Sequence, residues 1–203
     1  GARRGASSPC SALNRDDDAL MPHDPTVAAR PFVIGIAGWK NSGKTTLVER
    51  LVAELVARGL RIATVKHAHH GFDVDPGETD SARHRRAGAS EVAIVSARRW
   101  AIMHEIVEPE QEPMLDAMLA RLSPADVVIV EGFKTAPIPK IEVRRRDSRQ
   151  STPLHPADSM VIAIAADHAV AGASVPVLAL DDIQGLANLV VACRSLYDRR
   201  DGT

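Results

Sequence analysis

The chain has 203 residues, 45% of them hydrophobic and 25% charged, with 25 Lys and Arg against 26 Asp and Glu. This balance argues against a nucleic-acid coat protein or a polybasic membrane binder, because both rely on surplus positive charge. No apolar run approaches the ~20 residues that span a bilayer, and the first residues lack the apolar core of a secretory signal. We expect a cytoplasmic protein that has neither a membrane nor a nucleic acid as its partner.

Composition divides the chain into three parts. Residues 1–30 are rich in Ala, Ser, Arg, Asp and Pro and have no hydrophobic period, which predicts a flexible N-terminal tail, since such a segment buries too little apolar surface to offset its ordering entropy. Residues 31–198 are patterned as one folded domain of ordinary size. Residues 199–203 are predicted to be a short C-terminal tail.

The folded part opens with a strand, a helix and a strand. Phe32–Ala37 is an apolar run too short for a helix, which predicts a buried strand. Lys44–Arg58 carries a leucine at every fourth position of one face, which predicts an amphipathic helix. Arg61–Lys66 follows as a second strand. Short connections in this order imply parallel pairing of the two strands.

The same alternation continues more loosely to the C-terminus. We predict helices near Ser81–Ala87, Pro113–Leu122 and Asp182–Tyr197, and strands near Glu91–Ser96, Trp100–His104, Asp126–Glu131, Lys140–Val143, Met160–Ala165 and Val175–Leu180. The longer strands are continuously apolar rather than alternating, so both faces of their sheet should be covered by helices. The predicted class is α/β with a mainly parallel sheet.

The segment Gly38–Thr46, between the first strand and the first helix, matches the phosphate-binding pattern G-x-x-x-x-G-K-[ST]. Its glycines allow successive backbone N–H groups to point at one anion, and the helix N-terminus adds its positive dipole end. Lys44 is expected to reach the β and γ phosphates, and the Thr45 hydroxyl to ligate the bridging Mg²⁺. Trp39 and Lys40 lie outside the minimal pattern. The motif predicts a P-loop NTPase-type three-layer fold.

Carboxylates for this site are sought at the carboxyl ends of neighbouring strands. Glu131 ends an apolar strand at a Walker-B-like position and is the candidate to hold Mg²⁺ through its water shell, the alternative being a strand end that faces solvent. Asp73 and Asp75 follow the second strand, at the sheet edge where ligands bind. They could reach the metal or orient a water at the γ-phosphate.

Three histidines, His67, His69 and His70, lie just before these aspartates. They raise the alternative of a transition-metal site, against loop histidines that are solvated or contact phosphate. A second ligand cluster does not accompany them, and oxygen-rich Mg²⁺ chemistry suits the P-loop better.

Recognition of the base has one candidate. Asp167 follows the late strand Met160–Ala165, where its carboxylate could accept hydrogen bonds from the N1–H and N2–H₂ of guanine. That Asp167 is instead an exposed loop residue without this role is an equal alternative. Three arginine clusters, at 83–86, 98–99 and 144–149, are predicted to be solvated faces or contacts to an anionic ligand or acidic partner. They lack the interleaved aromatics of a nucleic-acid surface.

Several separated segments together resemble one family. They are Gly38–Thr46, Val65-Lys66-His67 with His69-His70 and Asp73-x-Asp75, Asp80-Ser81 followed by Arg86–Ala89, and Val130–Lys134. In this order they are similar to the molybdopterin-guanine dinucleotide biosynthesis protein B family, over about Phe32 to Tyr197.

The resemblance implies a dimeric GTP-binding accessory protein of molybdenum cofactor biosynthesis. Such a protein has weak intrinsic GTPase activity and assists the guanylyltransferase that converts molybdopterin to molybdopterin guanine dinucleotide. It places Mg²⁺ near Thr45, Glu131 and either Asp73 or Asp75. The GTP contacts that it implies are Gly38, Asn41, Ser42, Gly43, Lys44, Thr45 and Thr46.

Two other functions remain open from the residues. A small-molecule kinase would hold ATP on the P-loop and use Asp73 or Asp75 as a base toward an acceptor hydroxyl. A metallochaperone GTPase would use the histidines of the loop that begins at His67. We expect slow hydrolysis in either GTPase reading, because the sequence assigns neither a water-positioning Gln nor an arginine finger.

Overall fold

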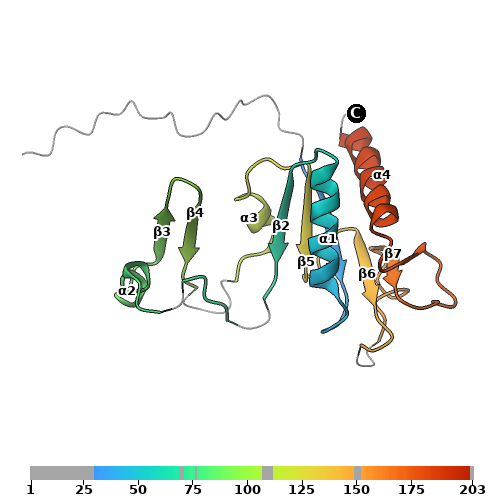
Figure 1. The fold of residues 1–203 in the computed structure, drawn as a ribbon, viewed down its shortest axis with the longest axis horizontal. Coiled ribbons are helices and arrows are strands. Elements are labelled where there is room, and N and C mark those ends of the chain that lie inside the picture. The colour runs from blue at the N-terminus through green and yellow to red at the C-terminus, as the bar shows by residue number, and fades with distance from the viewer. Residues whose placement is uncertain (1–29, 69–70, 76, 107–111, 149–151, 202–203) are drawn as a thin grey trace, which may run out of the picture.

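The computed structural model describes residues 30–68, 71–75, 77–106, 112–148 and 152–201, so all but the last residue of the tail predicted at 1–30, and the pair His69 and His70, lie outside it. Its centre is a parallel sheet of six strands in the order β2-β5-β1-β6-β7-β8 (Figure 1). The strands are β1 (Phe32–Ala37), β2 (Ile62–Lys66), β5 (Val127–Glu131), β6 (Lys140–Arg144), β7 (Val161–Ala166) and β8 (Val177–Ala179). The predicted α/β class is confirmed.

Strand β5 shows why these strands read as continuously apolar. All five of its residues are buried, and successive side chains point to opposite faces of the sheet. Val127 and Ile129 pack in the core that α1 (Lys44–Ala57) and α4 (Ile183–Asp201) cover. Val128 and Val130 pack on the other face, against the short helix α3 (Leu115–Leu119). Both faces of the central strands are therefore covered, as predicted.

Helix α1 is held by the predicted leucine face. Leu47, Leu51 and Leu55 recur every four residues and are almost fully buried. They join Ile34 and Ile36 of β1 in one core cluster. This packing fixes the start of the helix directly after the carboxyl end of β1, where the phosphate-binding motif lies.

Two helices differ in length from the prediction. Helix α3 ends at Leu119, earlier than expected, and the chain turns before Pro124, whose ring disfavours helical backbone in the residue before it. Helix α4 runs to Asp201 rather than Tyr197, since neither Gly nor Pro lies between Tyr197 and Gly202. Residues 199–201, assigned above to a C-terminal tail, are thus helical.

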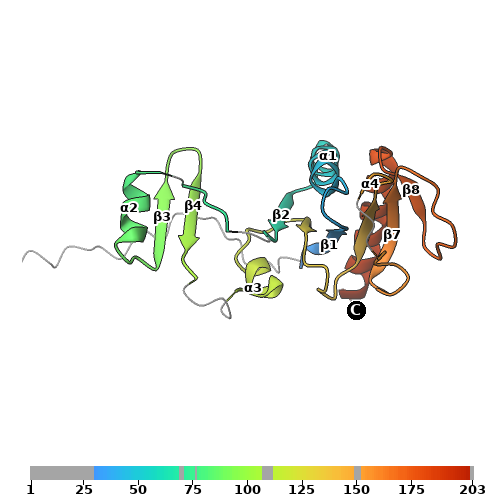
Figure 2. The same cartoon turned by 90° about the horizontal axis from the view of Figure 1, so that it is seen from below.

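A second unit lies apart from the main sheet (Figures 1 and 2). It consists of α2 (Asp80–Arg86) and an antiparallel hairpin of β3 (Glu91–Val95) and β4 (Trp100–His104), which form their own two-stranded sheet. We call these elements the hairpin unit. Helix α2 lies against β3, and both Ala82 and Val92 are buried.

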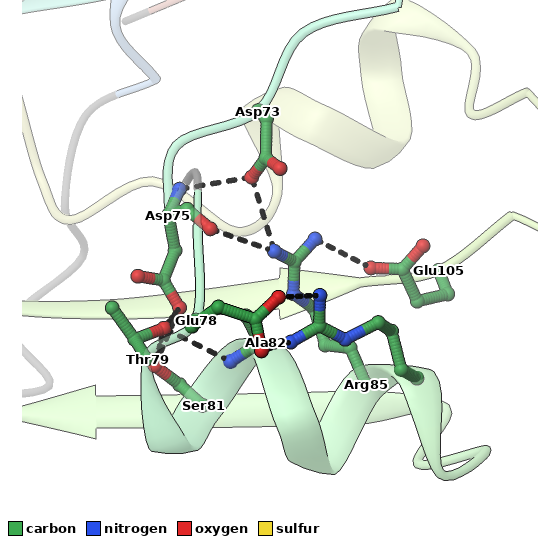
Figure 3. Close-up of polar contacts among 9 residues, drawn as sticks. Asp73, Asp75, Glu78, Thr79, Ser81, Ala82, Arg85 and Glu105 are labelled. Atoms are coloured by element: carbon green, nitrogen blue, oxygen red, sulfur yellow. Dashed lines mark hydrogen bonds and ion pairs between the residues drawn. The ribbon is translucent and has the colours of Figure 1, made fainter.

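Arg85 ties the hairpin unit together (Figure 3). Its guanidinium donates to the Asp73 carboxylate at 3.0 Å, to the Asp75 carbonyl at 3.0 Å and to Glu105, just after β4, at 3.3 Å. The Asp75 carboxylate accepts from the hydroxyls of Thr79 and Ser81 at the start of α2. The hydroxyl bond from Ser81, followed by that from Thr79, lowers the pKa of Asp75.

No helix in the described part of the chain is both long and apolar enough to cross a bilayer.

Replacing Arg85 with Gln should loosen the hairpin unit without unfolding the sheet. The glutamine keeps a polar group but loses the charge and the fork that joins Asp73 to Glu105. We expect amide hydrogens of β3 and β4 to exchange about tenfold faster, while those of β5 stay protected. The matched control is Arg83→Gln, because Arg83 is exposed and pairs only loosely with Asp80, at 3.6 Å. Equal exchange in both variants would contradict this role.

Asp126 should make the stability of the main sheet depend on pH. It accepts hydrogen bonds from the Arg61 backbone N–H at 2.8 Å and from the guanidinium groups of Arg61 and Arg194. The Arg61 side-chain bond is the main cause that lowers the Asp126 pKa. Because the pKa of Asp126 is lower in the folded state, this carboxylate stabilises the protein at pH values above its ordinary pKa of about 3.9. The stabilisation is lost as the pH falls through the folded pKa.

Urea unfolding between pH 3 and pH 7 measures this effect. Asp126→Asn should flatten the fall in unfolding free energy on the acid side, because the amide cannot titrate. Asp116→Asn, on an exposed carboxyl of α3, should leave the pH profile unchanged. An unaltered profile in the Asp126 variant would refute the prediction.

Candidate nucleotide-binding site

The loop between β1 and α1 has the backbone that the motif requires. Gly38 has φ 149°, and a Cβ there would lie 2.7 Å from the Val143 carbonyl oxygen, so only glycine fits. Asn41 adopts the left-handed conformation, with φ 66°. The Ser42 side chain is buried, and its hydroxyl has no hydrogen-bond partner among the described residues. The loop is thus packed tightly against β6 at Gly38, and it leads directly into α1.

Thr45 and Glu131 meet as the sequence predicts. The Thr45 hydroxyl donates to Glu131 Oε1 at 2.8 Å, across the gap between α1 and the carboxyl end of β5. Adjacent oxygens around Mg²⁺ lie about 3 Å apart, since each is about 2.1 Å from the metal. The spacing of this hydrogen-bonded pair is compatible with Mg²⁺, and the predicted binding of that ion stays a prediction.

Gly132 lets the chain leave β5 close to β2. Its φ is 96°, and a Cβ there would lie 2.8 Å from the Cβ of His67. The His67 backbone N–H in turn donates to the Glu131 carbonyl at 2.9 Å. A side chain at this glycine would push apart the two strand ends that flank the carboxylate.

Lys44 lies within a positively charged environment. Its ammonium donates to the Trp39 carbonyl at 2.6 Å. Burial is the largest influence on its pKa and lowers it, the Glu131 carboxylate opposes this, and Lys134 and Lys66 lower it further. Several cations thus share one carboxylate, which favours binding of an anion.

A cavity of about 540 Å³ opens beside the phosphate-binding loop. Its lining comes from α1, from the residues that follow β6, β7 and β8, and from β8 itself: Arg50, Arg145, Ala166, Asp167, His168, Val177, Leu178, Ala179, Leu180 and Asp181. The Arg145 guanidinium also lies against Gly43 of the loop. This volume is in the range of small-molecule sites, and Arg145 lies between the cavity and Gly43.

Asp167 is fixed at the rim of that cavity. Its Oδ1 accepts from the Arg146 backbone N–H at 2.9 Å and lies 2.8 Å from His168 Nδ1. The hydrogen bond with His168 is the main cause that lowers the Asp167 pKa, followed by the Arg146 bond. The carboxylate is thus ionised at neutral pH and can accept from a donor-rich base edge.

Asp73 and Asp75 are not brought to Thr45 and Glu131 in this structure. Both precede the hairpin unit and are hydrogen-bonded to it, through Arg85 and the start of α2 (Figure 3). Local hydrogen bonds to α2 therefore compete with any role at the phosphates. Their predicted catalytic and metal-binding roles stay predictions.

His67 is engaged as well. Its Nε2 lies 2.7 Å from a carboxylate oxygen of Glu112, and its ring packs on Phe133 with 4.8 Å between the ring centres. Within the described ranges, no group of three or more His, Cys, Asp or Glu side chains is arranged to hold a metal ion. The histidine-based metal site therefore gains no support from this part of the chain.

Sequence reasoning missed the role of Trp39. Its carbonyl holds Lys44, its indole N–H donates to the Thr152 carbonyl at 2.9 Å, and Lys134 lies over its ring at 3.9 Å. Arg50 was also missed, whereas Arg145 was predicted only as a member of the cluster at 144–149. Apart from the bond to Lys44, the contacts of Trp39 join segments more than ninety residues apart, so no local pattern marks them.

The chain is similar in sequence to one protein family and to several of its members. The family model described as molybdopterin guanine dinucleotide synthesis protein B matches residues 33–167. The molybdopterin-guanine dinucleotide biosynthesis adapter protein of Haemophilus influenzae is 42% identical over 136 residues, which cover 67% of this chain and 75% of the relative. The adapter protein of Escherichia coli is 38% identical over 161 residues, 78% of this chain and 91% of the relative.

Solved structures agree with this placement. A crystal structure of molybdopterin-guanine biosynthesis protein B matches with a TM-score of 0.63 at 28% identity, covering 80% of this chain and 99% of that one. A MobB homolog from Bacillus stearothermophilus matches with a TM-score of 0.60 at 28% identity, covering 79% and 98%. The family model spans most of the folded part, and the chain belongs to the molybdopterin guanine dinucleotide synthesis protein B family.

Proposed function

We propose that this protein is a GTP-binding adapter that assists the conversion of molybdopterin to molybdopterin guanine dinucleotide. The observation that carries the proposal is a P-loop in which Thr45 and Glu131 are in contact, with Arg145 between Gly43 of that loop and a cavity that Asp167 lines. The names of the relatives supply the biosynthetic step. The guanylyltransferase that performs the step is the proposed partner.

In this proposal the backbone of the loop cradles the phosphates. The contacts are Gly38, Asn41, Ser42, Gly43, Lys44, Thr45 and Thr46. Lys44 leaves the Trp39 carbonyl and pairs with the β and γ phosphates, since a phosphate is a far stronger partner for an ammonium than a carbonyl. Thr45 would ligate Mg²⁺ and Glu131 would hold the ion through its water shell, and the bound ion would neutralise charge between those phosphates.

The cavity beside the loop would take the nucleoside. The apolar side chains of Val177, Leu178 and Leu180 offer a surface for the flat base. The Asp167 carboxylate then accepts from N1–H and N2–H₂ of guanine, two donors that adenine does not present together. A guanine nucleotide therefore fits this rim better than an adenine nucleotide.

Hydrolysis by the isolated protein should be slow. The two aspartates proposed as water-positioning groups are tied to Arg85 and to α2. Arg145 lies beside Gly43 and lines the cavity that we assign to the nucleoside, so we do not assign it to the terminal phosphate. GTP occupancy would then tune an interaction rather than drive rapid turnover.

A titration with guanine, xanthine and adenine nucleotides tests the proposal. With Mg²⁺, calorimetry should show that wild type prefers GTP to ATP and that Lys44→Ala binds GTP about 100-fold more weakly. Asp167→Asn should lose about 10- to 100-fold in GTP affinity and gain affinity for XTP, because the amide matches the carbonyl that xanthine carries in place of the amino group.

Preference for ATP, with phosphorylation of an added acceptor, would instead favour the kinase. Unchanged GTP affinity in Lys44→Ala would exclude the P-loop as the binding site. Sub-micromolar nickel or zinc binding that depends on His67, His69 and His70 would favour the metallochaperone.

We further propose that the protein is a homodimer that pairs through the hairpin unit. Cross-strand neighbours Val95 and Trp100, and Ala93 and Ile102, lie on the hairpin face opposite to Val92, the buried residue beside α2. On this face Val95, Trp100 and Ile102 are 77%, 56% and 57% exposed. A two-stranded sheet is marginal alone, so a second copy that covers this face would stabilise it.

The substitution Ile102→Glu tests the dimer. It places a charge in the centre of the apolar face and should raise the dimer dissociation constant at least ~100-fold, because an unpaired buried carboxylate is costly. Sedimentation analysis measures the change. Met114→Glu is the control, since Met114 is an exposed apolar residue outside the hairpin. A monomeric wild type, or an unaffected variant, would defeat the proposal.

A further inference from the structure

Lysine is rare in this chain, and most of its lysines lie in or near the P-loop. The sequence holds five lysines against 20 arginines. Lys140 is buried in an ion pair with Asp158 at 2.9 Å, and the other four are Lys40, Lys44, Lys66 and Lys134. Lys40 and Lys44 belong to the phosphate-binding loop, Lys66 pairs with Glu131, and Lys134 follows Glu131 by three residues. An ammonium is a compact, mobile point charge that suits a phosphate group, whereas the planar guanidinium is more rigid.

Lys66 occupies the position beside the carboxylate. It is the last residue of β2 and stands in register with Glu131 of β5. Its ammonium lies 3.7 Å from Glu131 Oε1, and its side chain is 61% exposed. The same oxygen accepts from the Thr45 hydroxyl. Lys66 thus shares the carboxylate that would hold Mg²⁺ and retains the freedom to move toward an anion.

Lys134 is placed by Trp39. Its ammonium lies over the indole ring at 3.9 Å, an arrangement in which the ring attracts the cation. The carbonyl of the same tryptophan holds Lys44 at 2.6 Å, and its indole N–H is anchored to the Thr152 carbonyl. One residue of the loop therefore keeps two ammonium groups next to each other.

Among the described residues, Glu131 is the carboxylate that acts on Lys44 and pairs with Lys66. Lys134 and Lys66 disfavour the charged form of Lys44, which shows that the repulsion among them is felt at the loop. An anion at their centre relieves the repulsion. The β5 side of a P-loop is where Mg²⁺ bridges the last two phosphates, so the anion that reaches this point is the terminal phosphate.

We propose that Lys66 and Lys134 bind the terminal phosphate of a nucleoside triphosphate, and that Trp39 is the positioning residue for Lys134. The inference rests on the proposed nucleotide binding and deepens it. The lysines make the site selective for the triphosphate over the diphosphate. The adapter therefore has two distinguishable states, one before and one after loss of that phosphate.

The test compares the affinities of the full-length protein for GTPγS and for GDP, both with Mg²⁺. Lys66→Ala and Lys134→Ala should each weaken GTPγS binding about tenfold and change GDP binding less than about twofold, because GDP lacks the phosphate that they contact. Arg121→Ala, which removes one exposed positive charge after α3, should change neither affinity. Equal losses for both nucleotides, or no loss, would overturn the inference.

Trp39 supplies a second readout. The chain has two tryptophans, so Trp100→Phe leaves Trp39 as the only one. In that background GTPγS should change the Trp39 emission more than GDP does, because Lys134 moves off the ring, and Lys134→Ala should abolish the difference. Trp39→Phe keeps an aromatic face and most of the selectivity, whereas Trp39→Leu should lose it. Equal emission changes with the two nucleotides would contradict the arrangement.

The two hypotheses fail in different ways. If wild type binds GTP in a Lys44-dependent manner but the Lys66 and Lys134 variants keep their selectivity, nucleotide binding stands and the phosphate assignment is wrong. If wild type binds neither nucleotide, both are wrong.

Discussion

The contact between Thr45 and Glu131 is the constraint on which the site depends. It exists because β1 and β5 are parallel neighbours in register, with Ile36 opposite Glu131, so that one strand delivers the phosphate loop and the other the carboxylate to the same edge. The leucine face of α1 then holds the helix against this pair of strands. Local backbone choices at Gly38 and Gly132 serve the same contact, since each removes a side chain that would block a close approach.

Much of this arrangement could be predicted from the sequence, because it depends on short-range patterns. The apolar strands and the leucine spacing of α1 reflect burial on one or both faces, and the P-loop is a contiguous motif. Glu131 was predicted because a carboxylate at the carboxyl end of a parallel strand lies at the same sheet edge as the P-loop. Asp73 and Asp75 were placed by the same reasoning, yet the nearby Arg85, Thr79 and Ser81 hold them.

The remaining features depend on long-range order that no local pattern encodes. Arg145 reaches Gly43 only because β6 pairs with β1 on the side away from β5. Lys134 meets Trp39 for the complementary reason, since the chain leaves β5 beside the loop that follows β1. The hairpin strands were predicted correctly as strands, but their own pattern does not say whether they join the main sheet.

The position of the hairpin unit along the chain determines how its length can change. The unit interrupts the connection from β2 through α3 to β5, and β2 and β5 are adjacent in the sheet. Without it, strand, helix and strand would still form an ordinary crossover. The unit is therefore a modular insertion, which can lengthen, shorten or be exchanged without disturbing the sheet.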